Sequence, residues 1–322
     1  MQRRSFLKYS STLFGVLPLM QPTRLGMFNT GFRSIEDVVS FNIGVFKCTV
    51  FRDFMFRYQA KDFFINASQE ELAAALDKHQ VTPDNIPSPF IAVLLQQGKK
   101  KILIDTGVGF SEKPVTVRGD SVLFRGQLQQ LLQQEKITAG EITDVIITHF
   151  HPDHIGGLFS ENGQLNFPNA RFYMHEDEWN YWHSSRSDEQ PGQFKLFIEK
   201  NITTLKGHDL QLIRGDWVEL LPGITALKAE GHTPGQIALI VHSGNEHLLY
   251  ISDAFLHPLH IGRTDWRTNY DLSHEQAKQS RIKLLELAYK DNMLVNAFHF
   301  DFPGLGRIDK FKSNWIWNYS AK

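Results

Sequence analysis

The sequence contains very little cysteine: Cys48 is the only one among 322 residues. No disulfide can therefore form within this chain, and a cluster of thiolate ligands cannot be built from it. Any metal ion that the chain binds must be held by nitrogen and oxygen atoms.

The sequence also lacks an excess of charge of either sign. It has 34 Lys and Arg residues against 35 Asp and Glu residues, and its formal net charge is −1. Nucleic acid is therefore not expected as a partner, because no basic stripe could attract a phosphate backbone. The hydrophobic fraction of 42% and the charged fraction of 21% are ordinary for a globular protein. We expect a globular fold without a stable transmembrane span.

Residues 1–27 differ in character from the rest of the chain. Arg3 and Arg4 precede Phe6-Leu7-Lys8 and the mostly uncharged residues 9–20, an order that resembles a twin-arginine export signal. The apolar stretch is too short for a spanning helix. A basic tail is the simpler alternative, and without an Ala-x-Ala site both cleavage and an uncleaved anchor stay open. We expect an exported or periplasmic protein, with its folded domain in residues 28–322.

The pattern of apolar residues predicts a sheet near the start of this domain. Alternation through Phe41, Ile43 and Val45 resumes at Cys48 after an apparent slip in phase. Residues 90–95 and 102–104 flank a polar turn and predict a hairpin that ends at Asp105-Thr106-Gly107. Further strands are predicted at 145–148, 171–173, 224–227, 237–241, 248–251 and 293–298.

Helical patterns lie between these strands. Leucines at 128, 131 and 132 predict an amphipathic helix, and shorter helices are expected at 176–183 and 194–206. A long helix is predicted from Ser273 to Lys290, with Ser273 and Gln276 placed as a capping box. No Pro- or Gly-rich linker divides the chain, so the pattern indicates one α/β domain in which helices cover a sandwich of sheets.

The most informative segment is Thr-His-Phe-His-Pro-Asp-His-Ile-Gly-Gly at residues 148–157. Residues two apart at the end of a strand point the same way, so His149 and His151 can converge on one metal ion. Asp153 and His154 follow where the chain turns toward a helix, and they suit a second ion nearby. Four potential ligands within six residues predict a metal site.

This segment resembles the His-x-His-x-Asp-His signature of the metallo-β-lactamase superfamily. The other pieces of the family pattern follow in order. They are Asp105-Thr106-Gly107, Gly231-His232-Thr233-Pro234-Gly235, Ser252-Asp253 and His299. Taken singly, His232 could be a turn residue, Asp253 a helix cap and His299 a core histidine, but their joint occurrence favours the metal site.

The resemblance implies a metallo-β-lactamase αββα sandwich, in which helices flank two mixed β-sheets. It also implies two divalent metal ions. His149, His151 and His232 would bind one ion, Asp153, His154 and His299 the other, and Asp253 would lie between them. Asp105 would orient the site without binding an ion. Zinc is our default, although manganese, iron or cobalt would suit the same ligands.

Two ions about 3.5 to 4 Å apart lower the pKa of a shared water toward about 7. The resemblance thus predicts a hydroxide nucleophile, with Asp153 and Asp253 as the catalytic carboxylates.

The substrate depends on the pocket, which the fold alone does not decide. Residues 298–306, with Trp315 to Tyr319 beyond them, resemble the subgroup of methyl parathion hydrolase and related lactone or ester hydrolases. We therefore expect a small-molecule lactone, carboxylic ester or phosphotriester substrate, and the resemblance also favours a homodimer. The expected pocket residues are Phe150, Trp182, Phe194, His257 and Phe300.

Three alternatives stay open at this point. The chain could be a thioester hydrolase of the glyoxalase II type, or an iron-dependent oxidoreductase on the same fold. It could also be a binding protein that keeps its metal only for structure.

Overall fold

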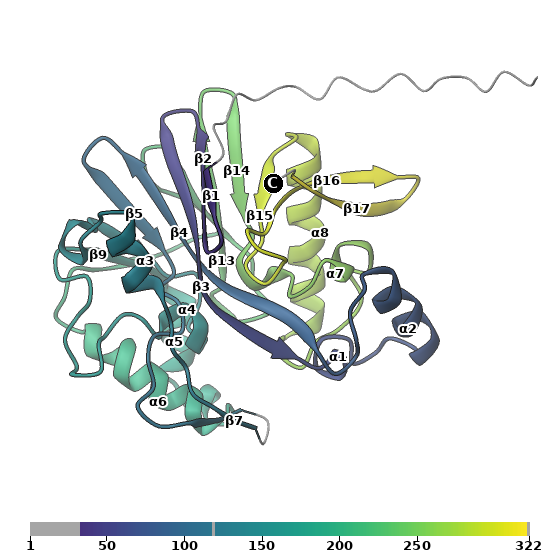
Figure 1. Cartoon of the computed structure of the whole chain (residues 1–322), viewed down its shortest axis with the longest axis horizontal. Helices are drawn as coiled ribbons and strands as arrows, with labels where there is room; N and C mark the ends of the chain where they lie inside the picture. The colour runs from purple at the N-terminus through teal and green to yellow at the C-terminus, as the bar shows by residue number, and fades with distance from the viewer. Residues whose placement is uncertain (1–32, 118–119, 321–322) are drawn as a thin grey trace, which may run out of the picture. The chain divides into compact units, whose positions relative to one another are not determined.

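Strands from both halves of the chain form two large sheets in the computed structural model, which describes residues 33–117 and 120–320 (Figure 1). The strands of the first sheet are, in spatial order, β1 (Arg33–Ile35), β2 (Val38–Ile43), β3 (Phe46–Tyr58), β4 (Ile86–Gln97), β5 (Lys100–Ile104), β8 (Asp144–Ile146), β9 (Arg171–His175) and β10 (Leu210–Ile213). Those of the second are β11 (Trp217–Leu221), β12 (Ile224–Lys228), β13 (Ile237–Ser243), β14 (Glu246–Tyr250), β15 (Leu294–Asn296), β16 (Leu305–Phe311) and β17 (Asn314–Tyr319). A separate small hairpin consists of β6 (Val115–Val117) and β7 (Asp120–Val122).

Both large sheets are mixed. In the first, β5, β8, β9 and β10 pair in parallel, while β1 to β5 pair antiparallel. In the second, β14 and β15 are parallel and the remaining pairs are antiparallel.

The alternation of side chains along each strand places one face of each sheet inside the sandwich. On β4, Val93 and Leu95 belong to the cluster between the sheets, whereas Leu94 belongs to the cluster on the outer face. On β13, Leu239 points inward and Ile240 outward in the same manner. Since both faces of these central strands are buried, their sequences are almost continuously apolar.

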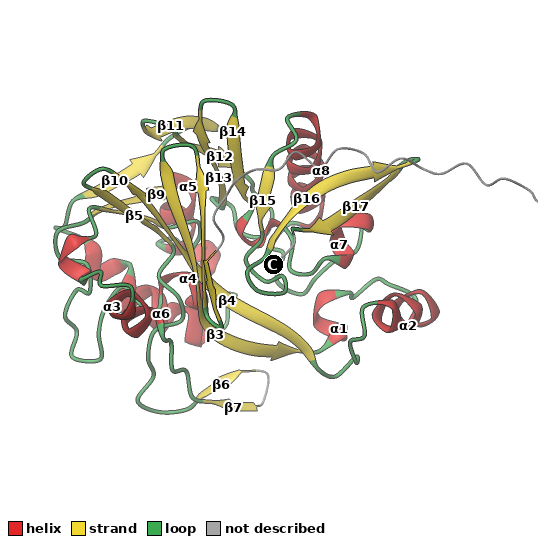
Figure 2. Ribbon diagram, turned by 45° about the horizontal axis from the view of Figure 1, so that its top comes forward, coloured by secondary structure: helices red, strands yellow, loops and turns green. Residues whose placement is uncertain are grey.

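Helices cover both outer faces (Figure 2). The first sheet packs against α3 (Leu128–Gln134), α4 (Pro152–Ile155), α5 (Glu176–Trp182) and α6 (Gly192–Asn201). The second packs against α7 (Leu259–Gly262) and α8 (His274–Lys290). Two further helices, α1 (Ala60–Phe63) and α2 (Gln69–Lys78), lie between β3 and β4 in the chain and bury a smaller cluster of their own. The predicted αββα sandwich is confirmed.

Most of the predicted elements are present, with two differences in detail. The apparent slip in phase near Val45 is a hairpin turn between β2 and β3, in which Gly44 adopts φ +52°. The helix predicted for residues 194–206 is α6 followed by a separate 3₁₀ turn, η3 (Thr203–Leu205). Ser273 caps α8, because its side chain accepts a hydrogen bond from the backbone N–H of Gln276, which is one of the two hydrogen bonds of the predicted capping box.

The predicted export signal, residues 1–27, lies outside the described residues. Within the part of the chain that the structure describes, no helix has the length and apolar character needed to cross a membrane.

The contact between the sheets generates a prediction about stability. Replacing Leu239 with alanine removes a fully buried side chain from this interface. The free energy of unfolding should fall by about 2 to 5 kcal/mol, the usual cost of such a cavity. Urea denaturation measures this change. Val45→Ala, at a side chain that is 63% exposed, should change stability by less than about 0.5 kcal/mol; an equal loss in both variants would contradict the assignment of Leu239 to the core.

Candidate metal centre

The loops that carry the predicted ligands meet at one edge of the sandwich. Strands β5 and β8 run parallel in the first sheet, so the loops after them leave at the same end. In the second sheet β14 and β15 are parallel, and β12 runs in their direction because both β12 and β14 are antiparallel to β13. His149, His232, Asp253 and His299 follow β8, β12, β14 and β15 respectively.

The histidine segment changes from strand to helix within a few residues. Strand β8 ends at Ile146, and α4 begins at Pro152, whose fixed φ suits the first position of a helix. This single helical turn presents Asp153 and His154 after the extended His149 and His151. Gly157 is required beside it, because an added Cβ would lie 2.0 Å from the carbonyl oxygen of Thr106.

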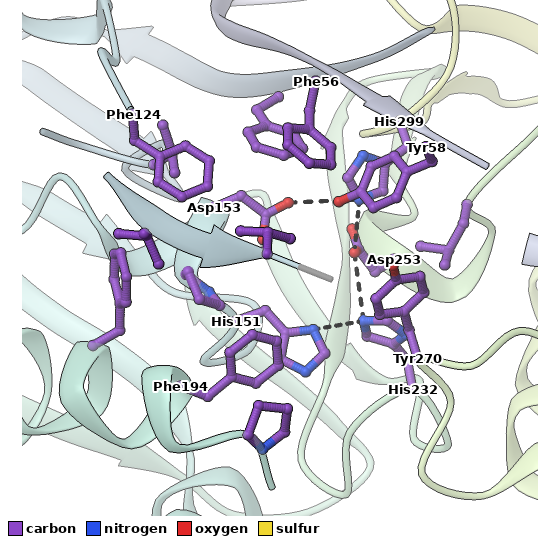
Figure 3. Close-up of a pocket in the computed structure, with 18 of the residues that line it drawn as sticks. Phe56, Tyr58, Phe124, His151, Asp153, Phe194, His232, Asp253, Tyr270 and His299 are labelled. Carbon is purple, nitrogen blue, oxygen red and sulfur yellow. Dashed lines mark hydrogen bonds and ion pairs between the residues drawn. The ribbon is translucent and has the colours of Figure 1, made fainter. Parts of the chain in front are cut away.

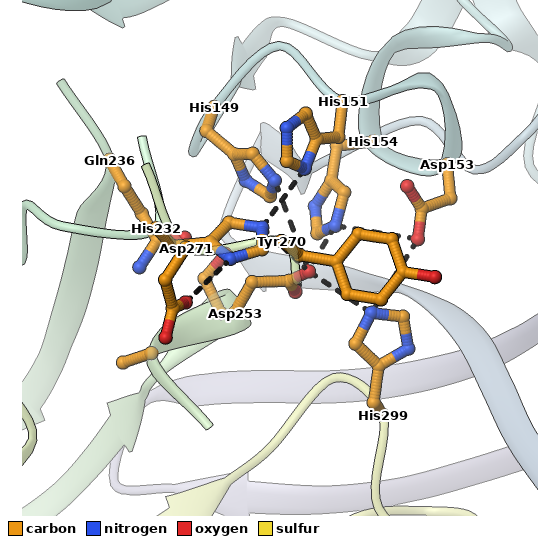
Figure 4. A network of polar contacts seen from close by, with 12 residues as sticks. His149, His151, Asp153, His154, His232, Gln236, Asp253, Tyr270, Asp271 and His299 are labelled. Atoms are coloured by element: carbon orange, nitrogen blue, oxygen red, sulfur yellow. Dashed lines mark hydrogen bonds and ion pairs between the residues drawn. The ribbon is translucent and has the colours of Figure 1, made fainter. Parts of the chain in front are cut away.

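The first group of ligand atoms consists of His149, His151, His232 and Asp253, all of them buried (Figure 4). Their nitrogen and oxygen atoms lie within 4.8 Å of one another. The Nε2 atom of His232 is 2.9 Å from Nδ1 of His151 and 3.4 Å from Oδ2 of Asp253. These distances would allow three imidazoles and one carboxylate to surround a single ion.

The second group consists of Asp153, His154, His299 and the same Asp253. Oδ1 of Asp253 is 3.2 Å from Nε2 of His154, and its Oδ2 is 3.0 Å from Nε2 of His299. Nε2 of His299 is also 3.6 Å from a carboxylate oxygen of Asp153. Asp253 therefore stands between the two groups, at the position that the sequence predicted for a bridging carboxylate.

The state of these buried atoms fits a metal site. Nε2 of His149 is buried and makes no hydrogen bond within the described part of the chain, whereas Nε2 of His154 and Oδ1 of Asp253 face each other at 3.2 Å. A buried polar atom such as Nε2 of His149 would cost about 1 to 3 kcal/mol unless something binds it. Burial and the neighbouring imidazoles lower the pKa of His149 and of His151 well below the usual value. Neutral imidazoles have the lone pair that a metal ion requires.

Asp105 orients the second group. It follows β5 with φ +57°, and its carboxylate accepts hydrogen bonds from the backbone N–H of Thr148 at 2.8 Å and from the Tyr250 hydroxyl at 3.0 Å. Its Oδ2 also lies 2.8 Å from Nδ1 of His154, which leaves Nε2 of that ring directed at Asp253. This placement agrees with the prediction that Asp105 supports the site without binding an ion.

Two supporting residues were not found by sequence reasoning. Asp271 lies 3.2 Å from Nδ1 of His232 and accepts a hydrogen bond from the buried Arg281 at 2.7 Å. Ser88 on β4 lies 2.9 Å from Nδ1 of His299. Neither residue belongs to a recognisable motif, and each is distant in sequence from the histidine that it contacts.

A cavity of about 460 Å³ opens beside the two groups (Figure 3). His151, Asp153, His232, Asp253 and His299 contribute to its wall. The remainder is mostly aromatic and aliphatic and includes Phe56, Tyr58, Phe63, Phe90, Phe124 and Phe194. Of the five pocket residues predicted from the sequence, Phe194 is the one that lines this cavity.

The other four predictions are corrected. Phe150 and Phe300 each adjoin a ligand in the chain, and they point away from it into the hydrophobic clusters outside the sheets. Trp182 also packs in the outer cluster, with its indole N–H donated to Glu178. His257 packs against other aromatic rings, 5.5 Å from Phe64 between ring centroids. Sequence reasoning missed most of the wall because its residues come from many separate elements, among them β3, α1, β4 and β6, and none of these has a chemical motif.

Curated proteins similar to this chain include lactonases and a probable metallo-hydrolase. An N-acyl homoserine lactonase from Bacillus cereus is 24% identical over 203 residues, which cover 60% of this chain and 74% of that enzyme. A second N-acyl homoserine lactonase, from Bacillus sp, is 26% identical over 196 residues, covering 57% and 70%. A probable metallo-hydrolase of Mycobacterium tuberculosis is 22% identical over 239 residues, covering 64% and 73%. The predicted metallo-hydrolase class agrees with these relatives.

Solved structures share the fold. A dizinc quorum-quenching lactonase, solved with a product, has a TM-score of 0.75 at 23% identity and covers 91% of this chain and 98% of its own. A hydrolase of the beta-lactamase superfamily has a TM-score of 0.77 at 21% identity and covers 90% and 99%. The family model of the metallo-beta-lactamase superfamily matches residues 92–295, which is more than half of the chain. The chain therefore belongs to the metallo-β-lactamase superfamily.

Proposed function

We propose that this protein is a dinuclear metal-dependent hydrolase that opens a lactone or cleaves a carboxylic ester with an apolar substituent. One observation carries the proposal. Two groups of four potential ligands, which share Asp253, lie beside one apolar cavity. The printed names of the relatives, N-acyl homoserine lactonases among them, support the choice of a lactone.

The ligand groups fit two zinc ions, the metal named for the similar dizinc lactonase. Two bound ions would supply a hydroxide nucleophile at neutral pH, because they lower the pKa of a shared water to about 7. The chain's own residues would orient the attacking group and exclude water. Asp153 lines the cavity, and its carboxylate can orient the attacking group by accepting a hydrogen bond from it. The aromatic wall excludes water from the reacting carbonyl.

The charge of the cavity distinguishes among the substrates expected from the sequence. Among the described residues that line it, the charged or metal-binding side chains are those of the two ligand groups, and no Lys or Arg is present. A glutathione thioester would bring carboxylates that need such cations. A neutral lactone, ester or phosphotriester needs none, so the lining favours these classes over a glyoxalase II-like substrate.

The shared carboxylate generates a prediction about metal content. Wild-type protein should contain about two equivalents of zinc, and Asp253→Ala should lose both ions and all hydrolytic turnover, because Asp253 belongs to both groups. Elemental analysis with an aryl ester and lactone panel measures both effects. Phe194→Ala, which changes the wall of the cavity and no ligand, should keep two equivalents. Two equivalents retained in Asp253→Ala would contradict the shared role.

The apolar wall generates a prediction about substrate preference. Phe194→Ala should lower kcat/KM about tenfold for substrates with a long apolar substituent and little for short ones, since a lost buried contact of this size is worth about 1 to 3 kcal/mol. Steady-state kinetics across substituents of increasing length measure the difference. Leu196→Ala, on the same helix at a side chain 72% exposed, is the matched control. Equal effects of both variants would count against Phe194 as a substrate contact.

We also propose that the protein is exported, on the support of the paired Arg3 and Arg4 ahead of an uncharged stretch. Replacing both arginines with lysine should keep the protein in the cytoplasm, because the pair is the part of the signal that its receptor reads. Fractionation followed by N-terminal sequencing of the exported protein measures both export and cleavage. Unchanged export of the double variant would contradict the proposal.

A further inference from the structure

Glu178 is a buried carboxylate close to the metal centre that belongs to neither ligand group. It lies on α5 and is 1% exposed. Its Oε1 accepts hydrogen bonds from the backbone N–H of Phe150 at 2.9 Å and from the indole N–H of Trp182 at 2.8 Å. Its Oε2 accepts one from the backbone N–H of Gly235 at 2.9 Å. A buried carboxylate needs such partners, and both of its backbone partners, Phe150 and Gly235, belong to ligand-bearing loops.

The two backbone contacts join loops from different sheets. Phe150 stands between His149 and His151, in the loop after β8 of the first sheet. Gly235 lies three residues after His232, in the loop between β12 and β13 of the second sheet. One side chain thus ties together the two loops that carry the three imidazoles of the first group.

This contact requires a residue without a side chain at position 235. A Cβ added there would lie 2.1 Å from the backbone nitrogen of Glu178, so any larger residue would push the loop and the helix apart. The close approach brings the N–H of Gly235 within reach of the carboxylate. A change on either side of the contact should therefore disturb the same loop.

The second group is held by other residues. Asp105 contacts Nδ1 of His154, and Ser88 contacts Nδ1 of His299. These two supports come from β4 and the end of β5, both in the first sheet. Asp105 also accepts a hydrogen bond from the backbone N–H of Thr148, next to His149, so the contacts made only to the second group are those with the His154 and His299 rings.

We propose that Glu178 is a positioning residue that sets the affinity of the first group, His149, His151 and His232, for its metal ion. The inference rests on the proposed two-metal function. Within the described residues, no hydrogen bond or ion pair joins Glu178 to a ligand side chain, and its two backbone contacts hold the loops that carry the imidazoles. Replacing Glu178 should lower the affinity for one ion and leave the other ion bound.

Glu178→Gln is the variant that tests this most directly. Glutamine has the same shape, but its amide replaces one acceptor oxygen with a donor. An N–H would then face the N–H of Phe150 or of Gly235, and one loop would have to move. Loss of such supporting hydrogen bonds typically lowers metal affinity about 10- to 100-fold. We expect a loss in this range for one of the two ions and an unchanged affinity for the other.

The experiment is a zinc titration of the full chain against a chelator of known affinity, followed by cobalt substitution. The spectrum of the ion that remains in Glu178→Gln should match that of His232→Ala, in which the first group is broken, and not that of His299→Ala. The matched control is Asp177→Asn, which removes a negative charge one residue away, from a side chain 47% exposed that pairs with Lys228. It should leave both affinities unchanged.

The outcomes separate this inference from the function on which it rests. If the wild type binds no metal ion, the proposed function fails before Glu178 is tested. If the wild type binds two ions and Glu178→Gln lowers the affinity for neither ion, or for both ions equally, the inference is overturned. Circular dichroism checks that the variant folds. Should it not fold, Gly235→Ala carries the same test from the other side of the contact, and unchanged or equally weakened affinities there overturn the inference as well.

Discussion

The carboxylate of Asp253 holds the central position in this structure, because both groups of imidazoles converge on it. It lies within 3.0 to 3.9 Å of ring nitrogens of His149, His154, His232 and His299. Burial raises its pKa, but His299 and His154 together hold that pKa well below the usual value, so the carboxylate stays ionised. Strands from two sheets must end at one edge for this arrangement to exist, and the sandwich supplies that edge.

The sequence was informative where spacing along the chain dictates geometry. His149 and His151 stand two apart after a strand, and Pro152 begins the turn that places Asp153 and His154. The apolar runs 90–95 and 102–104 predicted a hairpin, and the structure pairs them as the antiparallel strands β4 and β5. Asp105 was expected to orient the site from its place in the family pattern, and it lies beside His154. Local pattern and family order therefore sufficed for the fold and for the candidate ligands.

The sequence was less informative where contacts join residues far apart in the chain. Asp271 supports His232 and Ser88 supports His299 across 39 and 211 residues, and nothing in the local pattern distinguishes either from an ordinary surface residue. The pocket was mispredicted at Phe150 and Phe300, which adjoin ligands in the chain and point into the outer clusters. In extended segments neighbouring side chains point to opposite sides, so Phe150 turns to the core.

The proposed metal centre consists of two ions that flank one carboxylate, and diffraction from crystals of the zinc-loaded protein at the zinc absorption edge tests this most directly. The anomalous map should contain two peaks about 3.5 to 4 Å apart. One should lie among His149, His151 and His232, the other among Asp153, His154 and His299, with Asp253 between them. A single peak, or peaks away from Asp253, would contradict a two-metal centre.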